Sequence, residues 1–256
     1  DIVFTCNDKN LPTSEKNLVV RSAIKLADEF KVKHGAIIHL EKKIPFPGGL
    51  VGGSSNAAIT LLALAKIWEI SVRLEELVEI GAEIGADVPF FFYGGTALGT
   101  DRGNRISEVA QQREKNMLIV TPNVDVSTAK AFSKLDAQGL TKNDSKSILQ
   151  NCCDDAERLE LGQLDLVNDF EKVIFGLSPK IESVKNKLLD QGARIALMTG
   201  SGASVFGVFD NEEKRQAAFE SFQSDNSMRV FRVETVSRDE YRDFLKPCDS
   251  LLKESL

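Results

Sequence analysis

The feature that most constrains the fold is a glycine-rich segment between a strand-like run and a helix-like run. It reads IPFPGGLVGGSSNAA, from Ile44 to Ala58, and holds four glycines and two serines within eight residues. A tight turn needs only one or two glycines, so four predict a loop with almost no side chains, which another group can approach closely. AIIHLEKKI before it has the apolar, β-branched content of a strand, and the residues from Ala57 to Trp68 follow with helical spacing.

A strand, a glycine-rich loop and a helix start together favour anion binding. The first N–H groups of a helix have no partner within it, and the helix dipole is positive there. Glycines let phosphate oxygens reach these groups, and the hydroxyls of Ser54 and Ser55 add donors. The alternative is that a Ser or Asn only caps the helix, but one residue is enough for a cap. The loop lacks the lysine of a P-loop and the spacing of a dinucleotide fingerprint, so it is of a third type.

Composition excludes several classes of protein. The 256 residues suffice for one large domain or two ordinary ones, and 42% hydrophobic with 27% charged residues is typical of a globular protein. A net charge of −6 argues against a broad nucleic-acid surface. No apolar run approaches the roughly 18 residues of a membrane span. Cys6, Cys152, Cys153 and Cys248 lack the spacing of a zinc site, so we expect reduced thiols.

Periodicity divides the chain into two blocks. In the first, we expect a helix from Asn17 to Gly35, a helix over 72–84, and an apolar strand and turn in VPFFFYGGTALG. In the second, MLIVT, RIALM, SVFGVF and MRVFRVETV are expected as strands, and STAKAF, LDLVNDFEKVIF, IESVKNKLLDQG and residues 212–222 as helices. Apart from a helical insertion, the second block has the order β-α-β-β-α-β, which is typical of a ferredoxin-like domain.

Two further segments carry candidate chemistry. Asp87 follows an expected helix and precedes the apolar run VPFFF, whose side chains would limit water around a carboxylate that accepts the proton of an alcohol. The alternative is that Asp87 bonds the backbone of a turn before Pro89. The segment Gly200-Ser201-Gly202-Ala203, between two expected strands, would form a second turn of backbone donors, with a plain β-hairpin turn as the alternative.

Three motifs carry a resemblance to a known family. PFPGGLVGGSSNAA resembles the second motif of the GHMP kinases, P-x-x-x-G-L-G-x-S-S-x-A. GADVPFFFYGGTALGTDRG and LMTGSGASVFGVF are similar to two further segments of that family, in the same order. KNLVVRSA, VSTAKAF and NDFE are lesser matches, which favour the branch that phosphorylates CDP-methylerythritol. The resemblance covers the chain to about Val236.

This resemblance implies a two-domain α+β fold, with a ribosomal-protein-S5-domain-2-like, ATP-binding N-terminal domain over 1–112 and a ferredoxin-like C-terminal domain over 113–256. It implies ATP and Mg2+ as cofactors, Asp87 as the catalytic residue, and transfer of phosphate to the 2-hydroxyl of CDP-methylerythritol in the non-mevalonate isoprenoid pathway. No nucleic acid or membrane partner is implied, and the protein would be a monomer or homodimer of the bacterial cytoplasm, or alternatively of the plastid stroma. A homoserine or mevalonate type of GHMP kinase and a non-catalytic nucleotide-binding relative are the alternatives.

The resemblance also implies roles for binding residues. Asn17, Leu18 and Lys42 would contact adenine, although Leu18 and Lys42 alone would pass for core and surface residues. Thr128 and Phe132 would line the cytidine-substrate pocket, with helix-core packing as the alternative for Phe132. The turn at 200–203 would bind phosphate, and one serine of the glycine-rich segment would hold Mg2+. That serine is Ser54, and the ATP-binding residues of this segment are Pro45, Gly48, Gly49, Leu50, Gly52, Gly53, Ser54, Ser55 and Asn56.

The sequence departs from the family pattern at three places. Pro47 and Val51 stand where small residues, often glycine, are usual. Because Pro47 removes an N–H donor and Val51 stiffens the loop, we expect reduced nucleotide affinity. The family begins with a strand holding P-A-K-I-N-L, whose lysine assists catalysis, followed by a Tyr/Phe-His pair that contacts cytidine. Neither occurs here, so we expect several dozen further residues ahead of Asp1.

Overall fold

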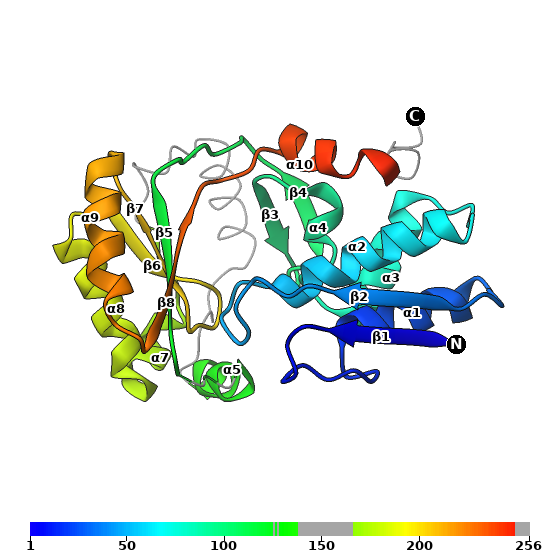
Figure 1. The fold of residues 1–256 in the computed structure, drawn as a ribbon, viewed down its shortest axis with the longest axis horizontal. Helices are drawn as coiled ribbons and strands as arrows, with labels where there is room; N and C mark the ends of the chain where they lie inside the picture. The colour runs from blue at the N-terminus through cyan, green and yellow to red at the C-terminus, as the bar shows by residue number, and fades with distance from the viewer. Residues whose placement is uncertain (125, 127, 138–165, 249–256) are drawn as a thin grey trace. The chain divides into compact units, whose positions relative to one another are not determined.

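The chain folds into two units, whose elements are labelled in Figure 1. The computed structural model describes residues 1–124, 126, 128–137 and 166–248. Unit 1 holds residues 1–44, 51–111 and the segment from Val236 onward, and unit 2 holds residues 45–50 and 112–235. The glycine-rich segment therefore passes from unit 2 to unit 1 between Leu50 and Val51. Within the described residues, no helix is long and apolar enough to cross a bilayer.

Unit 1 packs helices against a small parallel sheet. Strands β1 (Ile2–Cys6) and β2 (Ala36–Leu40) pair in parallel. Helices α1 (Leu18–Glu29), α2 (Gly52–Ile67) and α3 (Leu74–Ile84) share one core. Helix α2 is apolar on most of its circumference, so it lies inside this core. The unit also contains α4 (Phe90–Tyr93), β3 (Ala97–Thr100), β4 (Arg105–Glu108), α10 (Arg238–Phe244) and the 3-10 turn η1 (Lys246–Cys248).

The helix expected after Asn17 is confirmed, but it ends before Gly35. The Asn17 Oδ1 accepts a hydrogen bond from the Val19 N–H at 3.0 Å and so caps α1. The helix ends at Glu29, and Lys31 has the left-handed φ of +51°. A left-handed residue cannot continue a right-handed helix, so the chain turns there.

The strand expected in VPFFFYGGTALG is wrong in its first half. Residues Phe90–Tyr93 form α4, and β3 begins only at Ala97. Pro89 has φ −52° and ψ −39°, and the fixed φ of proline suits the first turn of a helix. A continuous apolar run has no period of its own, so its sequence does not distinguish a strand from a short buried helix.

Unit 2 has the expected ferredoxin-like sheet. Its strands β5 (Met117–Pro122), β6 (Ile195–Met198), β7 (Val205–Val208) and β8 (Met228–Val233) are antiparallel. Their order is β6-β7-β5-β8, so the first and third strands along the chain are central. Helices α8 (Pro179–Asp190) and α9 (Glu212–Gln223) share one core with the same face of this sheet (Figure 1). Helices α5 (Thr128–Ala137) and α7 (Glu171–Leu177) complete the described part.

The helix expected in LDLVNDFEKVIF begins later than predicted. Helix α7 starts at Glu171, and residues 164 and 165 lie outside the described part of the chain. The Asn168 Oδ1 accepts a hydrogen bond from the Phe170 N–H at 3.0 Å, which holds these residues in a local turn. Asparagine competes with the helix for backbone donors in this way, so the turn precedes the helix.

Candidate active site

Helix α2 begins without a side-chain cap. Its N-cap residue is Val51, which has no hydrogen-bonding side chain, and Ser54, Ser55 and Asn56 lie inside the helix. The alternative in which a serine or asparagine caps this helix is therefore wrong. No acidic residue lies in the first turn either. The N–H groups at the start of a 16-residue helix therefore have no side chain or carboxylate of their own turn as acceptor, which suits an anion.

The cap residue itself has an unusual backbone. Val51 has φ +45° and ψ +24°, a left-handed conformation that a β-branched residue rarely adopts. This is one of the two positions at which small residues are usual in the family. The left-handed conformation explains why glycine would suit it, because glycine has no β-carbon to clash with the neighbouring main chain.

Lys42 and Leu18 lie beside the start of α2. A β-carbon placed on Gly52 would be 2.8 Å from Lys42 Nζ, and one placed on Gly53 would be 3.6 Å from Leu18 Cδ1. Asn7 holds the main chain of Lys42, since its Oδ1 accepts from the Lys42 N–H at 2.7 Å and its Nδ2 donates to the Lys42 carbonyl at 3.3 Å. Burial lowers the pKa of Lys42. Lys42 is thus a partly desolvated cation next to an uncapped helix start.

Asn17, the third residue implied as an adenine contact, is engaged in local structure. Its Oδ1 caps α1, and its Nδ2 donates to the Pro12 carbonyl at 2.9 Å. One polar end of the side chain therefore holds the first turn of α1, and the other holds the segment ahead of it.

The first glycine pair allows close packing of two main-chain segments. Gly49 has φ +67°, and a β-carbon there would lie 2.3 Å from the Thr199 carbonyl oxygen and 2.9 Å from that of Gly202. A β-carbon on Gly48 would lie 3.0 Å from Ser204 Oγ. In unit 2, these two glycines therefore let one main chain lie directly against another. The ATP-binding roles predicted for Gly48 and Gly49 stay predictions, and close packing is a further reason for the absence of side chains at both positions.

The second glycine pair is open at only one of its two positions. A β-carbon on Gly53 would meet only the Leu18 side chain at an ordinary distance, whereas one on Gly52 would lie 2.8 Å from Lys42 Nζ and 3.0 and 3.2 Å from two carbons of the Ile44 side chain. These two glycines are the first residues of α2, where the N–H groups lack intrahelical partners.

One main-chain N–H and one hydroxyl, from the two residues that flank the turn at 200–203, hold Gly48. The Ser204 N–H and the Thr199 Oγ1 both donate to the Gly48 carbonyl, at 3.1 and 3.2 Å. The hydroxyls of Ser204 and Thr121 are buried and lie 2.8 Å apart. The sequence interpretation did not assign Thr121, Thr199 or Ser204. Hydroxyl residues beside a glycine turn are a signal for them, but a weak one, because such residues are frequent in loops.

Asp87 lies in the turn between α3 and α4. Its neighbours Val88 and Pro89 are buried, while Asp87 itself is accessible to solvent. The protein on its inner side still desolvates the carboxylate enough to raise its pKa. The hydrogen bond that closes the turn runs from the Val88 N–H to the Gly85 carbonyl at 3.0 Å, so main-chain groups close it. These features leave the carboxylate available for a substrate.

The raised pKa of Asp87 predicts that the wild type and a variant without this carboxyl group differ in stability by an amount that depends on pH. A carboxyl group whose pKa is raised by folding contributes stability below its unfolded pKa, and that stability is lost as the pH rises through its folded pKa. We expect Asp87→Asn to unfold at higher urea concentration than the wild type at pH 7, with the two midpoints converging as the pH falls below about 3.8. A constant difference at all pH values would contradict desolvation of this group.

The two residues implied as substrate contacts lie on α5. Thr128 is the first residue of this helix. Phe132 is 50% exposed, and its ring meets that of Phe170 edge-on, with the ring centroids 4.8 Å apart. Helix-core packing is therefore wrong for Phe132, which offers an aromatic face at the surface of unit 2.

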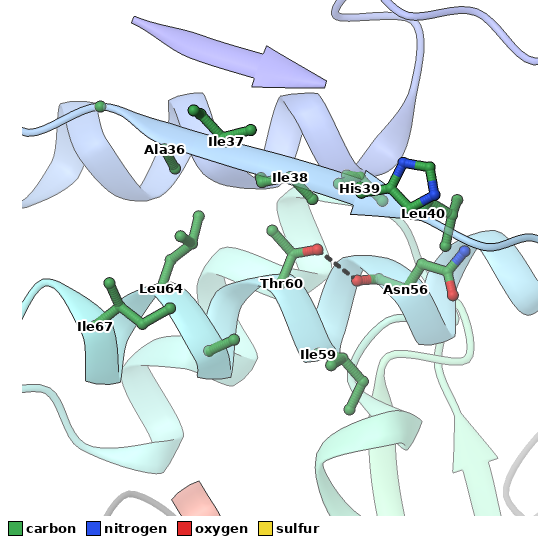
Figure 2. Close-up of a pocket in the computed structure, with 13 residues that line it drawn as sticks. Ala36, Ile37, Ile38, His39, Leu40, Asn56, Ile59, Thr60, Leu64 and Ile67 are labelled. Carbon is green, nitrogen blue, oxygen red and sulfur yellow. Dashed lines mark hydrogen bonds between the residues drawn. The ribbon is translucent and has the colours of Figure 1, made fainter. Parts of the chain in front are cut away.

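A groove of about 680 Å³ runs between β2 and α2 in unit 1 (Figure 2). It is mainly apolar, and its polar side chains are His39, Asn56 and Thr60; the Thr60 hydroxyl donates to the Asn56 carbonyl at 2.7 Å. No lysine or arginine is among its lining residues, so it offers no cation to a triphosphate. The lining residues are Val19, Gly35, Ala36, Ile37, Ile38, His39, Leu40, Asn56, Ile59, Thr60, Ala63, Leu64 and Ile67.

Two family models match the chain. That of the GHMP kinase N-terminal domain matches residues 17–95, and that of the GHMP kinase C-terminal domain matches residues 148–227. The chain is 34% identical to 4-diphosphocytidyl-2-C-methyl-D-erythritol kinase of Caldanaerobacter subterraneus subsp. tengcongensis, with 86% of this chain and 76% of the relative covered. It is 37% identical to the protein of the same name from Bacillus velezensis, with 83% and 73% covered.

Solved structures agree with this assignment. A crystal structure of 4-(cytidine 5'-diphospho)-2C-methyl-D-erythritol kinase superposes with a TM-score of 0.71 at 27% identity, and covers 90% of this chain and 81% of that one. A homoserine kinase from Cytophaga hutchinsonii superposes with a TM-score of 0.69 at 23% identity, covering 93% and 82%, and shows the shared fold alone. Together with the two family matches, these similarities show that the chain belongs to the GHMP kinase family.

Proposed function

We propose that this protein transfers the γ-phosphoryl group of ATP to the 2-hydroxyl of CDP-methylerythritol. The observation that carries the proposal is the 34–37% identity, over more than four fifths of the chain, to relatives named for this substrate. The proposal takes unit 1 as the ATP-binding domain and unit 2 as the C-terminal domain. The boundary at residues 112 and 113 agrees with these units, but the segment from Val236 onward belongs to unit 1 rather than to the C-terminal domain. Because the relatives are bacterial, we place the reaction in a bacterial cytoplasm, with a plastid stroma as the alternative.

The start of α2 would hold the triphosphate. Its uncapped N–H groups can donate hydrogen bonds to an anion without displacing a cap, and Lys42 Nζ adds a positive charge beside Gly52. A bound phosphate would also stabilise the charged state that burial disfavours in Lys42.

Ser54 is the residue whose chemistry fits Mg2+. It is only 8% exposed, and its hydroxyl oxygen has no hydrogen bond to any part of the chain that the structure describes. Bound Mg2+ neutralises phosphate charge during transfer, and it takes few protein ligands when phosphates supply the others. A single hydroxyl oxygen at the start of a phosphate-binding helix is consistent with that pattern.

Asp87 would act on the acceptor alcohol. A solvent-accessible carboxylate with a raised pKa can accept a hydrogen bond from the 2-hydroxyl and take its proton as the bond to phosphorus forms. Thr128 and Phe132 would contribute to the site for the cytidine end of the substrate, with the Phe132 ring as a stacking surface.

A comparison of acceptor alcohols tests the proposal. The protein from its complete reading frame is incubated with ATP, Mg2+ and CDP-methylerythritol, homoserine or mevalonate in turn, and ADP release is measured. We expect turnover with CDP-methylerythritol at least about 100-fold above that with the other alcohols, because a binding site for the cytidine moiety discriminates strongly. Faster turnover of homoserine would identify another GHMP kinase. ATP binding without turnover of any of the three alcohols would contradict the proposal and favour a non-catalytic relative.

A further inference from the structure

The segment NDFE, residues 168–171, clamps the end of strand β6. The Asn168 Nδ2 donates to the carbonyls of Met198 and Gly200, both at 2.8 Å. The Glu171 Oε1 accepts from the Met198 N–H at 2.8 Å, and its Oε2 accepts from Lys185 Nζ at 2.5 Å. Three hydrogen bonds from two side chains thus reach main-chain groups at the point where β6 enters the glycine turn.

Two of these bonds replace a neighbouring strand. β6 is an edge strand, and the Thr199 N–H pairs with the Ser204 carbonyl at 2.9 Å in the ladder with β7. Because hydrogen-bonding directions alternate along an antiparallel pair, the N–H and C=O of Met198 point away from β7. Glu171 and Asn168 satisfy these two groups, which an edge strand would otherwise leave to solvent.

The third bond, from Asn168 to the Gly200 carbonyl, satisfies no group of strand β6. It reaches beyond the strand to Gly200, which has φ +48° and no side chain to restrict the following peptide. The peptide between Gly200 and Ser201 is not among the cis bonds, so its C=O and N–H point in opposite directions. When Asn168 holds the Gly200 carbonyl, it therefore also sets the direction of the Ser201 N–H.

We propose that Asn168 is a positioning residue for phosphoryl transfer, which orients the Ser201 N–H toward the phosphate that the glycine turn binds. The inference rests on the proposed function. Glu171 secures the same strand end without contacting the turn, so its role is structural. A donor held in place before the reaction stabilises developing charge without reorganisation, whereas a peptide free to rotate must be ordered first.

The test compares Asn168→Ala with Glu171→Ala as a matched control in the same segment. We expect Asn168→Ala to lower kcat about 10–100-fold with KM for the acceptor alcohol changed less than about threefold, because one oriented donor contributes mainly in the transition state. We expect Glu171→Ala to cost more stability in urea unfolding, since it leaves Met198 and Lys185 without a buried partner, yet to keep kcat within about threefold.

Amide hydrogen exchange measures how firmly Asn168 holds the glycine turn, independently of catalysis. We expect the peptide containing Ser201 to exchange faster in Asn168→Ala than in Glu171→Ala in the absence of substrate. If the wild type turns over normally, and the two variants lose kcat equally and exchange at equal rates, the positioning role of Asn168 is overturned while the proposed function stands. Absent wild-type turnover would instead remove the proposed function, while the exchange contrast would still report whether Asn168 orders the turn.

Discussion

Replacing Asp87 with asparagine is expected to lower kcat by about 10²- to 10⁴-fold while the Kd for ATP changes less than about threefold. The amide has nearly the same shape as the carboxylate, but it cannot accept the proton of the 2-hydroxyl. The triphosphate is assigned to the start of α2, which this substitution leaves unchanged. We therefore expect turnover to fall while ATP binding is kept, because the proton acceptor and the proposed triphosphate site lie on different elements.

Steady-state turnover and calorimetric ATP titration measure the two effects. Glu79→Gln is the matched control, because it removes one exposed carboxylate from α3 in the same unit and leaves the turn at Asp87 intact. The control should keep kcat within about twofold, since a distant surface charge has little influence through water. Wild-type turnover in Asp87→Asn would remove this carboxylate from the mechanism.

Substituting Gly49 with alanine is expected to lower the free energy of unfolding by about 2–4 kcal/mol. The new β-carbon would lie 2.3 Å from the Thr199 carbonyl oxygen, and the residue would keep a left-handed φ of +67°. The neighbouring atoms are main-chain atoms of a hydrogen-bonded turn, so they cannot move aside as a side chain can. The packing of residues 45–50 against the glycine turn in unit 2 would be lost.

Gly53→Ala provides the contrast within the same segment. Its β-carbon would have room, and alanine in a helix is more favourable than glycine by about 0.5–1 kcal/mol, so stability should be unchanged or slightly raised. The methyl group would nevertheless stand at the uncapped helix start, and we expect ATP binding to weaken. Urea unfolding and calorimetric ATP titration of both variants test whether Gly49 serves packing and Gly53 serves ATP binding. Equal stability of Gly49→Ala and the wild type would contradict the packing role.

Much of the fold follows from patterns within short stretches of sequence. The β-α-β-β-α-β order in the second block led to the observed sheet of unit 2, because its strands are short apolar runs separated by polar, helix-forming segments. Asn17 marked the start of α1, because it is a strong N-cap residue followed by an amphipathic repeat. The strand predicted in VPFFFYGGTALG was wrong in its first half because this run has no period. Only Pro89 and Gly94, at the two ends of the short helix, indicate its bounds.

The site divides in the same way. The glycines and serines at 48–55 predict a phosphate loop and Asp87 a catalytic carboxylate, and both roles stay predictions. The need for glycine at positions 48 and 49 comes from atoms more than a hundred positions away in the sequence. Thr199 and Ser204 lie so close to Gly48 and Gly49 that a side chain at either position would clash. The clamp of Asn168 on Gly200 is equally invisible along the chain, because an asparagine before a helix usually reads as a local turn.

The sequence thus indicated the family and the type of reaction through the resemblance of three motifs, and most of the order of the elements through periodicity. The three-dimensional packing settled that α2 begins without a cap, that one glycine pair lets two main chains pack closely, and that the Asn168 side chain holds the second glycine turn. The physical reason is that periodicity, capping and turn preferences act over a few neighbouring residues. Close contact between main chains and the partners of a polar side chain depend on groups that only folding brings together.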